Sequence, residues 1–188
     1  MKNQILGFFS ALLMVLAVIT TDARAQDLEN VLYMDLATGR VVIELRPDLA
    51  PVHVARVKEL TRQGFYDGLK FHRVIPGFMA QTGDPRGDGT GGSGKKLPAE
   101  FSSEKFVRGT LGAARTSDPN SADSQFFITF GDTPHLNGQY TVWGKVTSGM
   151  NLVDGIAKGE PPMNPDKIVK MTVAADEISK APVENAAQ

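Results

Sequence analysis

The stretch over residues 71–84, FHRVIPGFMAQTGD, constrains the fold of this chain more than any other part of the sequence. Pro76 and Gly77 interrupt two short apolar runs, and a Pro-Gly dipeptide is typical of a turn. The stretch therefore predicts two short strands with a turn between them. The whole chain holds 19 Gly and 11 Pro. So many turn-forming residues favour a β-rich fold over a helical bundle.

The second run of this stretch predicts which side chains share a face. Successive side chains of a strand point to opposite faces of a sheet. If the strand keeps this alternation throughout, Phe78 and Ala80 face one way, while Met79 and Gln81 face the other. Met79 and Gln81 would then offer an apolar surface and an amide on one side.

Arg73 lies inside the first apolar run. Its guanidinium must find an acceptor or stay in contact with water, because an unpaired buried charge is costly. Together with Gln81 and the apolar side chains nearby, Arg73 suits an uncharged, amide-like ligand with an apolar body. The alternative is a core hairpin whose arginine lies on the surface or pairs with an acidic residue.

Other parts of the chain show strand and helix patterns. A helix is expected from Pro51 to Gly64, with an apolar residue every three positions and with Asp48 as an acid near its N-terminus. A second, short helix is expected at 150–157. Alternation and β-branched residues predict strands at 31–36, 39–45, 110–115, 124–130, 142–146 and 167–175. About eight strands and two helices indicate a mainly β domain, as a barrel or a sandwich.

The first 25 residues predict a signal peptide. Lys2 precedes an apolar run over 5–19, and Ala23-Arg24-Ala25 is a typical cleavage site. We expect cleavage after Ala25, a mature domain over 26–188 and a frayed tail over 178–188. The chain has no cysteine and no Asn-x-Ser/Thr sequence. These features predict a periplasmic protein that has no membrane span after cleavage.

Several classes of function are disfavoured. The net charge of −1 argues against a nucleic-acid partner, which usually meets a basic face. His53, His72 and His135 have no metal-ligand spacing, and we expect no metal or other cofactor. The loop Gly89–Lys96 resembles a phosphate-binding loop, but Lys96 stands where a magnesium-binding Ser or Thr is required. A helix cannot follow directly, because Leu97 and Pro98 come next.

Several motifs, in order, resemble those of the cyclophilins, the cyclosporin-binding family of peptidyl-prolyl cis-trans isomerases. The resemblance spans nearly the whole mature chain. The motifs are residues 71–84, Gly89–Gly92, Leu111–Arg115, Ser124–Ile128 and Trp143–Val146. It implies a closed eight-stranded antiparallel barrel, capped by two α-helices, with the site on the outer face.

The resemblance also assigns site residues. It implies that Arg73 is the catalytic cation and that Gln81 hydrogen-bonds the substrate backbone. Phe126 is instead expected to pack in the core, opposite Phe127. The remaining site residues are the proline pocket of Phe78, Met79, Phe127 and Leu136, the groove residues Ala114 and Arg115, the supporting residues His72 and Gln125, and the edge residues His135 and Tyr140.

The implied activity is isomerisation of X-Pro bonds in unfolded or partly folded exported polypeptides, by a monomer. The chain departs from many cyclophilins at His135, where they have Trp, at Tyr140, where they have His, and at Arg115, where Asn is frequent. The alignment also needs an extra residue between Arg115 and Ser124. Because that Trp contacts cyclosporin in the family, we expect weak cyclosporin binding.

Two other classes of function are alternatives to an isomerase. A non-catalytic module could hold proline-containing segments as a chaperone, although such a module needs no cation at the prolyl nitrogen. A lipocalin-like barrel would need an apolar lumen, which the bulky side chains of a small barrel would fill.

Overall fold

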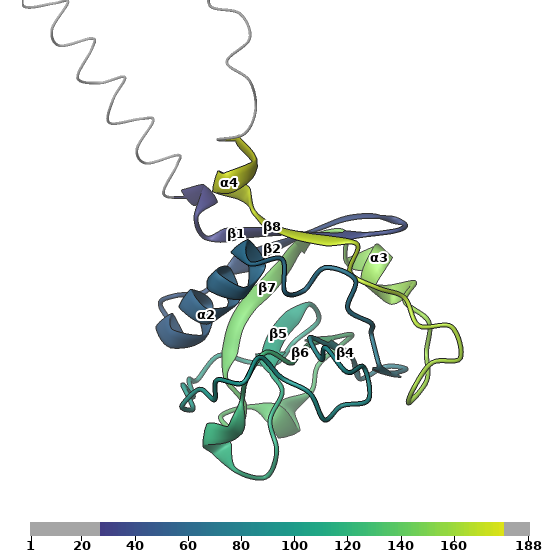
Figure 1. The fold of residues 1–188 in the computed structure, drawn as a ribbon. Helices are drawn as coiled ribbons and strands as arrows, with labels where there is room; N and C mark the ends of the chain where they lie inside the picture. Colours follow the sequence, from purple (N-terminus) through teal and green to yellow (C-terminus); the bar gives the residue numbers. More distant parts are fainter. Residues whose placement is uncertain (1–26, 179–188) are drawn as a thin grey trace, which may run out of the picture.

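The computed structural model describes residues 27–178, which form one curled antiparallel sheet with short helices around it (Figure 1). The sheet has eight strands in the order β3-β4-β6-β5-β7-β2-β1-β8. Their bounds are β1 Val31–Leu36, β2 Gly39–Leu45, β3 Arg73–Ile75, β4 Met79–Thr82, β5 Thr110–Ala113, β6 Phe126–Thr129, β7 Val142–Ser148 and β8 Lys170–Val173. The predicted strands are confirmed, most with later starts or earlier ends.

The predicted closed barrel is wrong, because the sheet is an open half-barrel. β3 and β8 lie at the two ends of the strand order and do not pair with each other. The outer edge of β3 is already used: Val74 donates to the Gly159 carbonyl at 2.8 Å, and Gly159 donates back at 2.9 Å. Near this opening a single bridge joins Lys70 to Lys167.

Three α-helices lie in the described range, where the sequence predicted two. α2 (Pro51–Arg62) packs on β7 and β8, and α3 (Met150–Asp154) packs on β2. α4 (Ala174–Ile178) replaces the end of the last predicted strand, which stops at Val173. Two 3-10 turns, η1 (Pro119–Ser121) and η2 (Pro134–Leu136), complete the elements.

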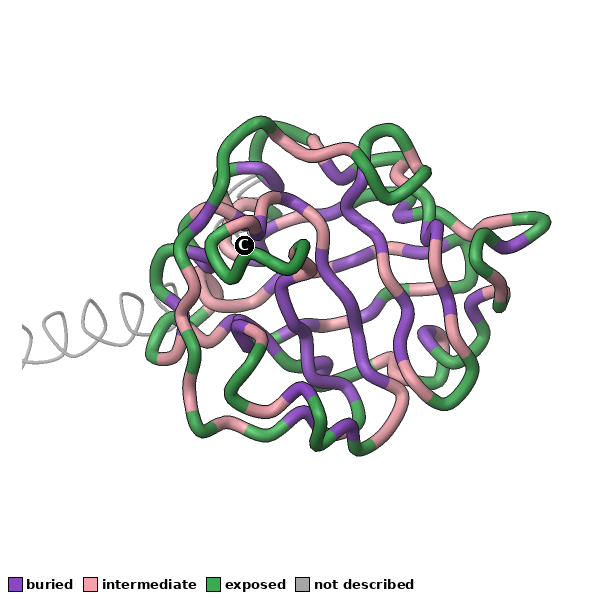
Figure 2. Tube along the Cα trace, turned by 90° about the horizontal axis from the view of Figure 1, so that it is seen from below, coloured by how far each residue is buried: buried purple, intermediate pink, exposed green. Residues whose placement is uncertain are grey.

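The sheet separates two clusters of buried side chains. The larger one contains Ala80, Phe126 and Trp143 and takes in the apolar stripe of α2. The smaller one, on the opposite face, consists of Met79, Phe106, Phe127, Leu136 and Val142. Figure 2 shows the buried residues along the central strands and the exposed ones in the peripheral loops. Neighbours in sequence therefore belong to different clusters, as the alternation of β-strands requires.

A distant carboxylate caps the N-terminus of α2. Glu100 accepts hydrogen bonds from the amides of Val52 (3.0 Å) and His53 (2.9 Å), and its Oε2 lies 2.6 Å from Nδ1 of buried His53. Asp48, the acid expected near this N-terminus, lies before the helix and pairs with Arg46 at 2.7 Å, and the first turn itself holds no acidic residue. Helix amides need such acceptors, and any carboxylate within reach can supply them.

The predicted signal peptide and all of the predicted frayed tail beyond Ile178 lie outside the described residues. None of the helices within 27–178 has the length and apolar character of a membrane span.

Removing the Glu100 cap should destabilise the protein. Glu100→Ala leaves two helix amides and buried His53 without their acceptor, so we expect the free energy of unfolding to fall by about 1–3 kcal/mol. Denaturant unfolding at pH 7 measures it. Exposed Glu59 lies on the same helix, and Glu59→Gln is the matched control, expected to change stability far less.

The effect of Glu100 should also depend on pH. Burial of Glu100 favours a higher pKa, but bonds from Val52 and then from the His53 ring and amide outweigh it and hold the pKa below the usual range. A lowered pKa adds stability above the unfolded value of about 4.3, and that stability is lost as pH falls through the folded pKa. The difference in unfolding free energy between wild type and Glu100→Gln should therefore shrink as pH falls through the folded pKa. A constant difference would contradict this prediction.

Candidate active site

The hairpin of β3 and β4 places a cation beside an amide. Arg73 and Gln81 are directly opposed in the antiparallel register, so their side chains share the outer face of the sheet. Nη1 of Arg73 lies 3.5 Å from Oε1 of Gln81. Nε of Arg73 donates to Glu160 at 2.7 Å. The alternative of an arginine that pairs with an acidic residue is thus observed, in the same place as the candidate site.

A line of amide hydrogen bonds continues from Gln81. Its Nε2 donates to Oε1 of Gln125 at 2.9 Å. The Gln125 amide in turn donates to the carbonyls of Gly89 (3.0 Å) and Gly91 (2.8 Å). In each of the two glutamine side chains, the amide oxygen thus accepts from one neighbour and the amide nitrogen donates to the next. This pattern fixes Gln81 with its oxygen toward Arg73.

Buried Asp84 organises the glycine loop at the end of this line. Its carboxylate accepts the amides of Arg86 (2.8 Å), Asp88 (3.1 Å) and Gly89 (2.6 Å). Burial favours a higher pKa for Asp84, but the backbone donors outweigh it and hold that pKa below the usual range. The carboxylate is therefore charged at neutral pH and keeps the loop folded against β4.

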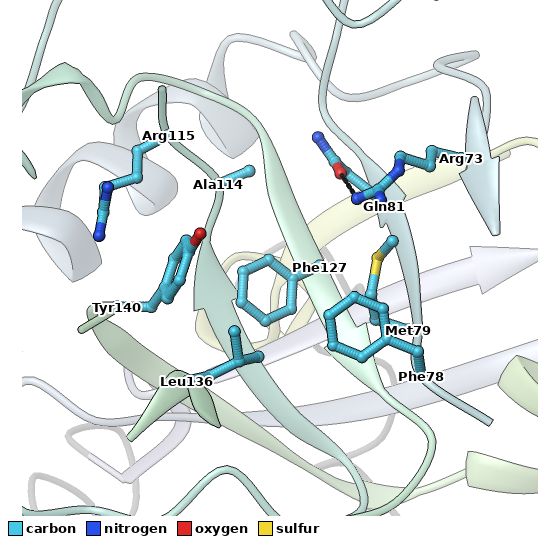
Figure 3. Close-up of a pocket in the computed structure, with 9 residues that line it drawn as sticks. All are labelled: Arg73, Phe78, Met79, Gln81, Ala114, Arg115, Phe127, Leu136 and Tyr140. Carbon is cyan, nitrogen blue, oxygen red and sulfur yellow. Dashed lines mark hydrogen bonds between the residues drawn. The ribbon is translucent and has the colours of Figure 1, made fainter. Parts of the chain in front are cut away.

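A pocket of about 100 Å³ opens beside Arg73 on the outer face (Figure 3). Phe127 forms its floor and is stacked on Phe106 with ring centroids 5.7 Å apart. The cation and amide stand at one end and the phenol of Tyr140 at the other. The lining consists of Arg73, Phe78, Met79, Gln81, Ala114, Arg115, Phe127, Leu136 and Tyr140.

Phe78 differs from the simple alternation. The prediction placed it with Ala80, but β4 begins only at Met79, and Phe78 belongs to the turn, its amide bonded to the Ile75 carbonyl at 3.1 Å. Alternation does not apply within a turn. Phe78 consequently lines the pocket with Met79, while Ala80 lies in the main core. That expectation was wrong for Phe78 alone.

Arg115 closes the other end of the pocket with its side chain. Its guanidinium lies 4.4 Å from the centre of the Tyr140 ring and donates to the Gln139 carbonyl at 2.8 Å. It also donates to the Thr116 carbonyl at 2.8 Å. Arg115 therefore connects the two loops on this side, and it does more than offer its backbone to the groove.

Three of the predicted site residues lie next to the pocket and do not line it. His135 packs its ring against Phe78 at a centroid distance of 5.4 Å. Gln125 lies one residue further along the polar line. His72 is buried near the glycine loop, where burial lowers the pKa of its imidazole although Asp84 opposes this. His72 is thus neutral at neutral pH and adds no charge to the site.

A second cavity of about 450 Å³ adjoins the pocket. Gln81, Ala114 and Arg115 line both spaces, so they form the boundary between them. The far side of the second cavity is the glycine loop and the loop with the extra residue, which contributes Thr116 and Ser121. Together the two spaces form one continuous groove on this face of the sheet.

Gly112 is a site residue that the prediction did not include. A Cβ at this position would lie 2.4 Å from Phe127 and 2.6 Å from Phe106. Only glycine lets the Phe127 ring lie flat across β5. A glycine inside a strand pattern is a signal for such a close approach. The sequence contained this signal, but it did not show which ring makes the approach.

Comparisons with known proteins agree with this geometry. The family model "Cyclophilin type peptidyl-prolyl cis-trans isomerase/CLD" matches residues 31–173. The chain is 58% identical over 171 residues to the "Probable peptidyl-prolyl cis-trans isomerase" of Brucella suis, covering 82% of this chain and 87% of the relative. It is 44% identical over 124 residues to peptidyl-prolyl cis-trans isomerase B of Bacillus subtilis, covering 65% and 86%.

Solved structures show the same fold. A cyclophilin from Hirschia baltica superposes with a TM-score of 0.74 at 28% identity, covering 80% of this chain and 76% of that one. A Cryptosporidium parvum cyclophilin type peptidyl-prolyl cis-trans isomerase, solved in the presence of the dipeptide Ala-Pro, gives 0.71 at 31% identity, covering 76% and 98%. This chain belongs to the cyclophilin-type peptidyl-prolyl cis-trans isomerase family.

No cluster of three or more metal-ligating side chains occurs within residues 27–178.

Enlarging Gly112 should displace the pocket floor. In Gly112→Ala the new methyl overlaps the Phe127 ring, and overpacking of this kind costs about 1–3 kcal/mol of unfolding free energy. Denaturant unfolding measures the loss, and aromatic NMR shifts report the ring movement. Gly131→Ala is the control, because a Cβ there meets no atom within 4 Å. An unmoved Phe127 ring in Gly112→Ala would contradict the assignment.

Proposed function

We propose that this chain catalyses cis–trans isomerisation of X-Pro peptide bonds with Arg73 as the catalytic cation. The observation that carries the proposal is the guanidinium of Arg73, held by Glu160 and Gln81 at the mouth of a pocket with an aromatic floor. Family membership supports the same activity.

The chemistry needs only what this site offers. An X-Pro bond resists rotation because of amide resonance, and uncatalysed exchange takes tens to hundreds of seconds. Rotation out of plane localises the lone pair on the prolyl nitrogen. A guanidinium aimed at that nitrogen stabilises the twisted amide more than either planar ground state, and this difference lowers the barrier.

The other residues take positions that fit this reaction. The proline ring lies on Phe127 among the apolar side chains of the pocket. Gln81, fixed by Gln125, hydrogen-bonds the substrate backbone beside the ring. The residues that precede the proline extend into the adjoining cavity. The part of the substrate that turns then lies outside the apolar pocket, where rotation meets less resistance.

The sequence also supports a proposal for the cellular setting. The leader pattern ending at Ala25 supports export, and the absence of cysteine and of Asn-x-Ser/Thr sequences supports the bacterial periplasm. We propose that the substrates are proline-containing segments of exported polypeptides that are still folding. The enzyme acts on them as a monomer and needs no cofactor.

Replacing Arg73 tests the proposal directly. Arg73→Ala should lower kcat/KM by at least about a hundredfold, because the charge that stabilises the twisted amide is lost. A protease-coupled assay on an Ala-Pro tetrapeptide measures it, and circular dichroism checks the fold. Arg108→Ala is the control: Arg108 is also an exposed arginine with a carboxylate partner, Asp154, but lies outside the pocket lining.

The non-catalytic alternative makes a different prediction for the same experiment. A module that only holds proline-containing segments would show no turnover in the well-folded wild type. It would still bind the tetrapeptide, as fluorescence or NMR titration would show. Full activity of Arg73→Ala would instead leave an isomerase and overturn the role of the arginine.

Cyclosporin binding should respond to His135. This side chain covers Phe78 at the pocket edge, at the position where many cyclophilins have a Trp that contacts the drug. We expect weak inhibition of the wild type. His135→Trp should tighten inhibition by at least about fivefold, the scale of a single aromatic anchor at an interface. The ratio of inhibition constants measures the effect, and an unchanged ratio would count against it.

A further inference from the structure

Glu160 is the one carboxylate bonded to Arg73 within the described residues. Its Oε2 accepts from Nε of Arg73 at 2.7 Å. The two residues stand 87 positions apart in the chain. The sequence gives Glu160 no motif, and it does not line the pocket. Its contact with the proposed catalytic cation therefore comes from the fold alone.

The backbone delivers Glu160 to this place. The preceding residue, Gly159, makes the two hydrogen bonds with Val74 that cover the outer edge of β3. Val74 follows Arg73 directly, so the same two bonds fix the carboxylate beside the guanidinium. Gly159 has a φ of +147°, a conformation that side chains rarely adopt, and a Cβ there would lie 2.6 Å from Pro162. The loop is thus specifically shaped at the point where it meets β3.

The guanidinium is held on two of its three nitrogens. Nε donates to Glu160, and Nη1 makes the weaker contact of 3.5 Å with Oε1 of Gln81. Nη2 has no hydrogen-bond partner within residues 27–178. An arginine side chain has four rotatable bonds and loses much rotational freedom when one orientation is selected. With two nitrogens held, the plane of the guanidinium is set and Nη2 stays available to a ligand.

Glu160 has two opposing effects on a cation in this position. It orients the guanidinium, which favours the twisted amide, and its negative charge weakens the field at the prolyl nitrogen, which disfavours it. Both side chains are about half exposed, at 42% for Arg73 and 52% for Glu160. Water screens the charge effect strongly at such exposure. The orienting bond joins atoms in direct contact at 2.7 Å, so water weakens it less than it weakens the field at the prolyl nitrogen.

We propose that Glu160 is a positioning residue that orients Arg73 for the transition state of isomerisation. The inference rests on the proposed function. It implies that Glu160 acts through kcat: an interaction realised only in the transition state lowers kcat and kcat/KM together when it is removed. Binding of the substrate in its planar ground state depends on the pocket, so removing the Glu160 side chain should leave KM unchanged.

Two substitutions separate orientation from charge. Glu160→Ala removes both the acceptor and the charge. Glu160→Gln keeps an oxygen that can accept from Nε and removes only the charge. If orientation decides, Glu160→Ala lowers kcat about two- to fivefold, the scale of one exposed ion pair, with KM unchanged, and Glu160→Gln restores most of it. Asp154→Ala is the matched control, since it removes the acceptor and the charge from the equally exposed pair with Arg108.

The experiment is the protease-coupled assay over a range of substrate concentrations, with each variant also placed in an Arg73→Lys background. A lysine has an ammonium group in place of the planar guanidinium, so Glu160 has no plane to orient. The effect of Glu160→Ala should therefore disappear in that background, and Asp154→Ala should have no effect in either. This pattern, together with rescue by Glu160→Gln, supports the positioning role.

Other outcomes overturn the inference in distinguishable ways. A kcat for Glu160→Ala equal to that of Asp154→Ala, with wild type active and Arg73→Ala inactive, removes the role of Glu160 and keeps the isomerase. Higher activity of Glu160→Gln than wild type shows that charge outweighs orientation. The same loss in the Arg73→Lys background shows a general effect of the loop. An inactive wild type overturns the proposed function itself, and the positioning role with it.

Discussion

The pleat of the central strands is the constraint on which this structure depends. In β4 and β6, each residue that enters the main core is followed by one that faces outward: Ala80 by Gln81, and Phe126 by Phe127. A slip of one residue would exchange the two faces and destroy the core and the pocket together. The pocket is therefore stabilised by the same burial that holds the sheet, and it needs no separate support for its apolar floor.

The polar side of the site has a different origin. Arg73, Gln81 and Gln125 form a line whose ends are held by Glu160 and by the glycine loop around Asp84. Each bond in such a line is exposed or only partly buried, so each contributes little to stability by itself. Their joint effect is geometric. A flexible cation is kept beside an apolar surface, which is the arrangement that the proposed reaction requires.

The open edge of the sheet and the placement of the cation are connected. A closed barrel would need β8 to pair along β3, and the Gly159 backbone occupies that edge instead. The loop that prevents closure is the loop that carries Glu160 to Arg73. The departure from a closed barrel thus lies at the site, and it gives β3 a partner whose side chain reaches the guanidinium.

The sequence by itself determined what depends on short-range periodicity and local chemistry. It determined the hairpin at Pro76-Gly77, the positions of the strands but not most of their ends, the opposite faces of Phe126 and Phe127, and, through family motifs, residues that the fold gathers around one pocket. Only the tertiary structure decided the open edge, the capping of α2 by Glu100 across 47 positions, and the bond from Glu160 across 87. The reason is physical: alternation is a property of neighbouring residues, whereas a carboxylate has many possible partners, and the path of the backbone decides which one it reaches.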